Sequence, residues 1–121
     1  MVYNLIQSII FSCILIYIQS GEAATHRPMT FLNKIQNTPN EEEQIFNHFC
    51  ITCHAEQPMI NLGAPRIHHP EDWQQRVSQG LEQILQHVNQ GYRAMPARGG
   101  CFECTDRQLH RTVLFMLRKI N

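Results

Sequence analysis

Two cysteines three positions apart, followed at once by a histidine, occur at Cys50, Cys53 and His54. This C-x-x-C-H order is the attachment pattern for c-type haem, in which each thiol bonds to one vinyl group of the porphyrin. A helical turn starting at Cys50 would bring the His54 imidazole to the iron as an axial ligand. The sequence therefore predicts a fold built around one covalently bound haem. The alternative is a plain C-x-x-C pair, either a redox dithiol or half of a zinc site, with an unrelated histidine behind it.

Length and charge limit what else the chain can do. Its 121 residues suffice for one small domain. Ten lysines and arginines balance ten aspartates and glutamates, so the composition indicates neither a nucleic-acid partner nor a strongly acidic one.

The first segment of the chain has the layout of an export signal. Residues 5–18 are almost wholly apolar, and a run of roughly 14 residues suits a signal peptide but is shorter than the roughly 20 that span a bilayer. Gly21 and Ala23 fit the small-x-small rule for cleavage after Ala23. We therefore predict a signal peptide at 1–23. No Lys or Arg precedes the apolar run, so an uncleaved anchor with loose membrane association is the alternative.

Residues 24–37 contain a proline and show no clear period, which predicts a flexible, irregular lead. Residues 38–121 are predicted to form one all-α domain, because apolar side chains recur at helical spacing and no segment alternates as a strand does. A capping box formed by Thr38 and Glu41 is expected to open the first helix. Prolines and glycines mark the other boundaries. The four predicted helices run from 38 to the haem motif, over 70–80, over 81–91 and from 105 onwards.

A second axial ligand would decide whether the iron is closed to substrates, and Met95 is the best-placed residue for this role. It follows the third predicted helix in an irregular loop, where Pro96 stops any helix. Met116 lies on the apolar face of the last helix, which favours a packing role. Met59 is too close in sequence to His54 to cross easily to the opposite haem face. The weaker candidates are Met29, His26, His48, His68, His69, His87 and His110.

Cys101 and Cys104 form a second C-x-x-C pair. In an exported chain they are predicted to form a disulfide, whose short loop contributes about 2 kcal/mol and acts locally on the turn before the last helix. A four-thiolate zinc site is disfavoured, because the two pairs lie much farther apart than the roughly 15–20 residues of zinc ribbons. Dithiol catalysis is a further alternative, weakened because both thiols precede the expected N-cap at Thr105.

Taken together, these motifs resemble the class I c-type cytochromes, and among them the cytochrome c5 group of Gram-negative bacteria. The resemblance covers roughly residues 41–117. It rests on Cys50-Ile51-Thr52-Cys53-His54, Gly63-Ala64-Pro65-Arg66, Trp73, Gly80-Leu81 and the ending Ala94-Met95-Pro96-Ala97-Arg98-Gly99-Gly100-Cys101-Phe102-Glu103-Cys104. Ala97 stands where such sequences commonly have a second proline.

The resemblance implies the class I cytochrome c fold, with about four helices packed around one covalently bound haem c. It implies thioether links at Cys50 and Cys53, iron ligation by His54 and Met95, and a disulfide between the second pair of cysteines. It also implies that the carbonyl of Pro65 accepts a hydrogen bond from the other ring nitrogen of His54.

We therefore expect a periplasmic mono-haem cytochrome that carries single electrons in a respiratory chain and is not an enzyme. Its partners would be donor and acceptor redox proteins in transient contact, with no small-molecule substrate and no nucleic acid. The main alternative is a haem enzyme or gas-sensing module in which Met95 leaves the iron. A second alternative is a haem-free exported protein that uses two dithiols.

Overall fold

The computed structural model describes residues 27–120, so the predicted signal peptide at 1–23 lies outside the described part. Within residues 27–120 the regular structure is helical, and the one strand-like pairing is an isolated bridge between Tyr92 and Met95. The prediction of an all-α fold is therefore confirmed. Over the same residues, no helix combines the length and the apolar character that crossing a bilayer requires.

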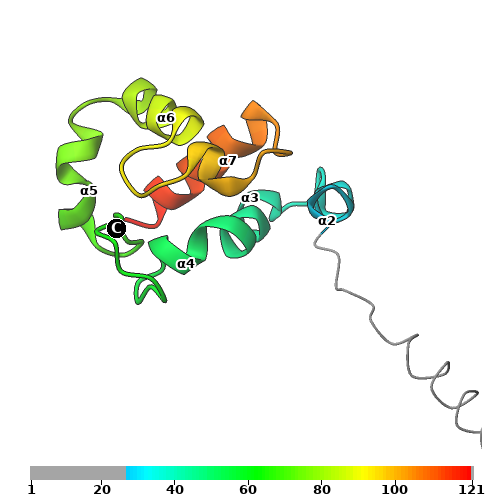
Figure 1. Cartoon of the computed structure of the whole chain (residues 1–121), viewed down its shortest axis with the longest axis horizontal. Helices are drawn as coiled ribbons and strands as arrows, with labels where there is room; N and C mark the ends of the chain where they lie inside the picture. Colours follow the sequence, from blue (N-terminus) through cyan, green and yellow to red (C-terminus); the bar gives the residue numbers. More distant parts are fainter. Residues whose placement is uncertain (1–26, 121) are drawn as a thin grey trace, which may run out of the picture.

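The helical segments follow one another with short or irregular connections. They are α2 (Pro28–Ile35), α3 (Glu41–Ile45), the π-helical η2 (Phe46–Cys50), α4 (Ile51–His54), α5 (Pro70–Val77), α6 (Leu81–Gln90), the 3-10 segment η3 (Ala97–Gly100) and α7 (Asp106–Arg118). The segments α3, η2 and α4 run on without a break and correspond to the first predicted helix, while α5, α6 and α7 correspond to the other three. Figure 1 shows α2 on the side of the domain opposite α5.

The prediction of an irregular lead over residues 24–37 is wrong where α2 forms. Leu32 and Ile35 of this helix are buried in a core cluster that also contains Ile45 of α3. Phe31, Leu32 and Ile35 have the spacing of one helical face, and the proline stands at a first helical position, where it is favourable. The lead is therefore a packed part of the domain from α2 onwards.

The capping box predicted at Thr38 is also wrong. The Thr38 hydroxyl donates to the carbonyl of Ile35 at 2.7 Å, so it closes α2 instead of opening α3. Glu41 is only 2% exposed, and its carboxylate accepts hydrogen bonds from the Asn37 backbone N–H at 3.1 Å and from the Gln108 amide at 2.7 Å. Glu41 thus joins the end of α2 and the start of α3 to α7.

The last helix begins as predicted. The Thr105 side chain accepts from the backbone N–H of Gln108, and the Gln108 side chain accepts from the Thr105 backbone N–H, which is a complete capping box. The predicted disulfide between Cys101 and Cys104 is present. Both cysteines are buried, at 0% and 3% exposure, in the cluster that holds Leu32. The disulfide is therefore part of the core, which extends the local role predicted for it.

Candidate haem-binding site

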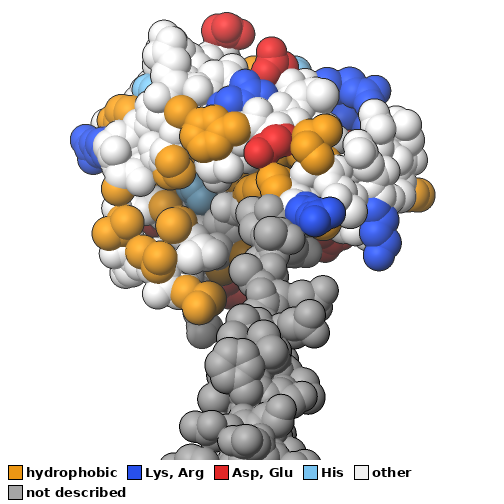
Figure 2. All heavy atoms as spheres, turned by 45° about the vertical axis from the view of Figure 1, so that its right-hand side comes forward, with side chains coloured by type: hydrophobic (Ala, Val, Ile, Leu, Met, Phe, Trp, Pro, Cys, Tyr) orange, Lys and Arg blue, Asp and Glu red, His pale blue; other side chains and the backbone are white. Residues whose placement is uncertain are grey.

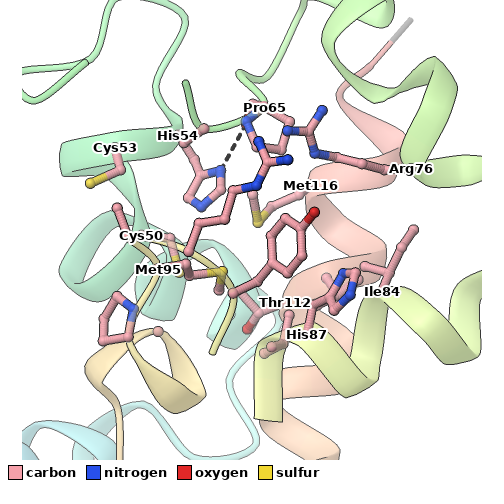
Figure 3. A pocket seen from close by; sticks show the side chains of 18 of the residues that line it. Cys50, Cys53, His54, Pro65, Arg76, Ile84, His87, Met95, Thr112 and Met116 are labelled. Carbon is pink, nitrogen blue, oxygen red and sulfur yellow. Dashed lines mark hydrogen bonds between the residues drawn. The ribbon is translucent and has the colours of Figure 1, made fainter. Parts of the chain in front are cut away.

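A cavity of about 270 Å³ lies among α4, α5, α6, α7 and the loop after α6. All four residues predicted for the site, Cys50, Cys53, His54 and Met95, line it. Figure 3 shows the two cysteines and His54 on one side, with Met95 approaching the same space from a different segment. Folded interiors contain few voids larger than a water molecule, so a cavity of this size indicates a binding site.

The side chain of His54 is fixed by one strong hydrogen bond. His54 ends α4 and is 8% exposed, and its Nδ1 lies 2.7 Å from the carbonyl oxygen of Pro65, as expected. Burial lowers the pKa of the imidazole, the hydrogen bond to Pro65 opposes this effect, and the positive charge of Arg76 adds to the lowering. The ring is therefore neutral at pH 7. Because Nδ1 donates its proton to the carbonyl, the lone pair is on Nε2, which is the form that binds a metal.

The segment that holds His54 is itself anchored to α5. The Arg66 guanidinium donates to both carboxylate oxygens of Asp72, at 2.7 Å and 3.2 Å, and the Trp73 indole N–H donates to the Arg66 carbonyl at 2.8 Å. The hydrogen bond from Arg66 lowers the pKa of the Asp72 carboxyl below its usual value. These bonds fix the backbone beside Pro65 and thereby the orientation of the His54 ring.

The two cysteines of the motif are free thiols at the cavity wall. Burial, with a smaller contribution from Cys53, raises the pKa of Cys50 to about 12. A redox dithiol needs a readily formed thiolate, so this environment is unsuited to dithiol chemistry. The π-helical segment η2 ends at Cys50, the first residue of the motif, and such segments are frequent at functional sites.

Met95 is held by a compact loop that follows α6. Tyr92 and Met95 exchange two backbone hydrogen bonds, at 2.9 Å and 3.1 Å, around a turn in which Arg93 has a φ of 54°. Gly91, which ends α6, packs so closely on this loop that a Cβ there would lie 2.9 Å from the Met95 oxygen and from the Ala97 nitrogen. The loop is therefore built directly onto the end of the helix.

The structure places most of the other candidate ligands away from the cavity. Met59 is 89% exposed. Met116 is an exception, because it is buried at the cavity wall in a core cluster with Phe46, Trp73 and Phe115. His69 bonds to Glu71. His26 lies outside the described residues, and the remaining exposed candidates are Met29, His48, His68 and His110.

The weaker candidate His87 lies at the cavity wall and has neighbouring side chains as partners. It lines the cavity, stacks on the Tyr92 ring at 4.1 Å between centroids and lies 3.0 Å from the Gln83 amide nitrogen. Its place on the same face of the third predicted helix as Ile84 was the only sequence signal that could have indicated this.

Three arginines at the cavity wall were missed by sequence reasoning, because nothing in their local pattern marks them. Arg76, Arg93 and Arg98 line the cavity, and no acidic side chain does so among the described residues. A haem carries two carboxylates on an otherwise apolar ring. Apolar walls, two free thiols, a neutral imidazole, a thioether and basic side chains therefore fit this group well, and together they define a c-type haem protein.

Comparisons with known proteins agree with this class. A family model described as cytochrome c oxidase, cbb3-type, subunit III matches residues 37–116. Cytochrome c5 of Ectopseudomonas mendocina is 33% identical over 73 residues, which are 59% of this chain and 80% of that protein. Cytochrome c-555 of Prosthecochloris aestuarii is 30% identical over 84 residues, which are 63% of this chain and 82% of that protein.

Two further matches extend the comparison. Cytochrome c-555 of Chlorobaculum tepidum is 33% identical over 72 residues, and the match covers 56% of this chain and 64% of that relative. A solved chain from a crystal structure of an electron transfer complex of nitrite reductase with cytochrome c has a TM-score of 0.60 and 28% identity, covering 69% of this chain and 98% of that one. The present chain belongs to the class I c-type cytochromes, and its cofactor is covalently bound haem c. The matches also support the function of a mono-haem electron carrier.

Proposed function

We propose that this protein is an exported, periplasmic cytochrome that transfers single electrons between redox proteins of a respiratory chain and catalyses no substrate reaction. Cys50 and Cys53 hold the haem through thioether bonds, and His54 and Met95 are the two axial ligands. The observation that supports this proposal is the meeting of these four side chains on one cavity, although Met95 comes from a segment about forty residues away.

The haem iron supplies a ferric and ferrous couple. The chain contributes two fixed ligands, because Pro65 orients the His54 ring and the paired turn at Tyr92 holds Met95. Rigid ligands keep the geometry similar in both oxidation states, which favours fast electron transfer. The thioether and the apolar cavity wall favour the ferrous state and raise the reduction potential.

Partners are proposed to meet the molecule near the segment after α4. Met59, Ile60 and Leu62 are exposed there, and Leu62 also lines the cavity. On the face drawn in Figure 2, apolar side chains gather toward the lower left, and the basic side chains lie mainly toward the top and right. A small apolar contact area suits brief encounters between redox proteins better than stable binding.

Carbon monoxide separates this proposal from a gas-binding or enzymatic role. If both axial positions are filled by protein, the reduced holoprotein at neutral pH shows no spectral change with carbon monoxide, whereas a Met95→Ala variant shows a full change. A full change in the unsubstituted protein would support the alternative, in which Met95 leaves the iron.

The thioether links have their own test. When the holoprotein is denatured and extracted with acidified organic solvent, haem should stay with the polypeptide in Cys50→Ala and in Cys53→Ala. In the double variant it should be extracted. Extraction from the unsubstituted protein would contradict covalent attachment.

A further inference from the structure

We infer that Arg98 is a positioning residue for Met95, and that its side chain determines how firmly the Met95 loop stays closed over the haem. The inference rests on the ligation proposed above. Arg98 lies in η3, between Met95 and the disulfide, and lines the same cavity.

The guanidinium of Arg98 connects the segments on both sides of this loop. It donates to the Cys104 carbonyl, to Asp106 Oδ1 at 2.9 Å at the start of α7, and to Asn89 Oδ1 at 3.4 Å near the end of α6. The Arg98 side chain is 23% exposed. Its bond to the Cys104 carbonyl is partly buried, whereas the bonds to Asp106 and Asn89 are exposed. One side chain therefore joins α6, the disulfide segment and α7.

Two features of Arg98 disfavour the folded state. Its φ of 58° is in the left-handed region, which is unfavourable for a residue with a Cβ. Its Nε–H is buried without a hydrogen-bond partner in the described chain. Strained backbone and unsatisfied buried groups occur together mainly at functional sites, where the surrounding structure enforces them. Because both features cost stability, a purely stabilising role does not explain why an arginine occupies this position.

The backbone around Arg98 supports the Met95 side chain directly. The Gly99 N–H donates to the Pro96 carbonyl at 3.1 Å, and the Cys101 N–H donates to the Arg98 carbonyl at 3.1 Å. A Cβ on Gly99 would lie 3.8 Å from the Met95 Cε, so this backbone is adjacent to the ligand's methyl group. If the Arg98 side chain no longer holds this segment, the backbone that packs against the Met95 side chain can move more freely.

Added imidazole measures how often Met95 leaves the iron. In the ferric protein, imidazole can bind only when the sixth position is open, so its apparent dissociation constant is the intrinsic value divided by the open fraction. We expect Arg98→Met to increase the open fraction, and hence the apparent affinity for imidazole, about tenfold, as loss of several polar contacts does. Arg98→Lys keeps the charge but not the forked geometry and should recover only part of the effect.

Arg111→Met is the matched control. Arg111 lies on α7, donates to Glu42 at 2.9 Å and thereby joins α7 to α3, away from the Met95 loop. The Arg111→Met variant loses the same charge as Arg98→Met. It should lower the stability to denaturant while changing the imidazole affinity less than about twofold. Asp106→Asn removes the negative charge that faces Arg98 but keeps an oxygen acceptor, and it should raise the affinity about two- to threefold.

The outcomes distinguish this inference from the proposed ligation. If Met95→Ala binds imidazole no more tightly than the unsubstituted protein, Met95 is not the ligand and the proposed function fails. If Met95→Ala binds much more tightly but Arg98→Met matches the Arg111→Met control, the inference is overturned and the ligation stands. Should Arg98→Met not mature, Arg98→Lys and Asp106→Asn decide the question, and control-level affinity in both overturns the inference.

Discussion

Replacing Gly91 by alanine tests how the Met95 loop is built onto α6. Gly91 has φ 83° and ψ 158°, a region of backbone conformation that is essentially restricted to glycine. A Cβ at this position would also meet the Met95 oxygen and the Ala97 nitrogen at 2.9 Å. These neighbours are backbone atoms, so they can move away only if the loop itself shifts.

The expected magnitude has two parts. The backbone conformation disfavours alanine by about 1–3 kcal/mol, and the forced contact adds about 1–3 kcal/mol, as overpacking does elsewhere. Gly91→Ala should therefore lower the free energy of unfolding by about 2–6 kcal/mol, a large fraction of the roughly 5–15 kcal/mol typical of a domain. Because the shift displaces Met95, the proposed bond between its sulfur and the iron should also weaken.

Gly80 provides a matched control at the start of the same helix. It has φ 90° and ψ 157°, almost the same conformation, but a Cβ there would meet nothing within 4 Å. Gly80→Ala should carry the backbone penalty of about 1–3 kcal/mol alone and leave the haem spectrum unchanged. The difference between the two variants isolates the contact with the Met95 loop.

Two measurements on the oxidised holoproteins are needed. Denaturant unfolding gives the free energy of unfolding. The visible spectrum gives the weak red-end absorption band that reports a bond from methionine to iron. The band should persist in Gly80→Ala and be reduced in Gly91→Ala. Equal stability losses and equal bands in the two variants would refute the close packing of the loop on α6.

The remaining predictions concern stability and are read from denaturant unfolding. Leu32→Ala should lower the free energy of unfolding by about 2–4 kcal/mol, because Leu32 is buried in the core, whereas Met29→Ala at an exposed position of the same helix should have little effect. Asp72→Asn should lower it by about 1–2 kcal/mol at pH 7. The pKa of Asp72 is lowered in the folded state, so its charge stabilises the fold at pH values above the usual carboxyl pKa. This stabilisation is lost as the pH falls through the lowered pKa, and the unfolding free energies of the parent and of Asp72→Asn should converge there. Replacing both Cys101 and Cys104 by alanine should lower it by about 2 kcal/mol from chain entropy alone.

Each of these predictions has a contrary result. Equal effects of Leu32→Ala and Met29→Ala would indicate that α2 is not packed on the domain. A difference between Asp72→Asn and the parent that grows at low pH would contradict the assigned charge state. Unchanged stability without the disulfide would show that its buried position contributes nothing.

The fold was predictable where the signals are local. The capping box at Thr105, the glycine stops at the ends of helices and the apolar spacing of α7 depend on neighbours in sequence, and they gave the correct helices. Residues 28–35 were misassigned because the stability of α2 comes from burial of Leu32 and Ile35 against distant segments. Thr38 fits the capping pattern equally well, but its hydroxyl bonds backwards to Ile35.

The candidate site residues were also drawn from local signals. The C-x-x-C-H motif and the Met95-Pro96 loop are short patterns with a chemical meaning, and the structure brings both to one cavity. Arg98 could not be found this way, because the role inferred for it depends on partners in α6, α7 and the disulfide segment and on a left-handed backbone that the sequence does not reveal.

The central proposal is that His54 and Met95 are the two axial ligands, and the most direct measurement is the visible spectrum and midpoint potential of the holoprotein beside two methionine variants. Met116 lines the same cavity, so Met116→Leu, a swap of similar volume, is the control. The red-end band should be present in the unsubstituted protein and in Met116→Leu. In Met95→Ala it should be absent, with a lowered midpoint potential. An unchanged band and potential in Met95→Ala would contradict the account.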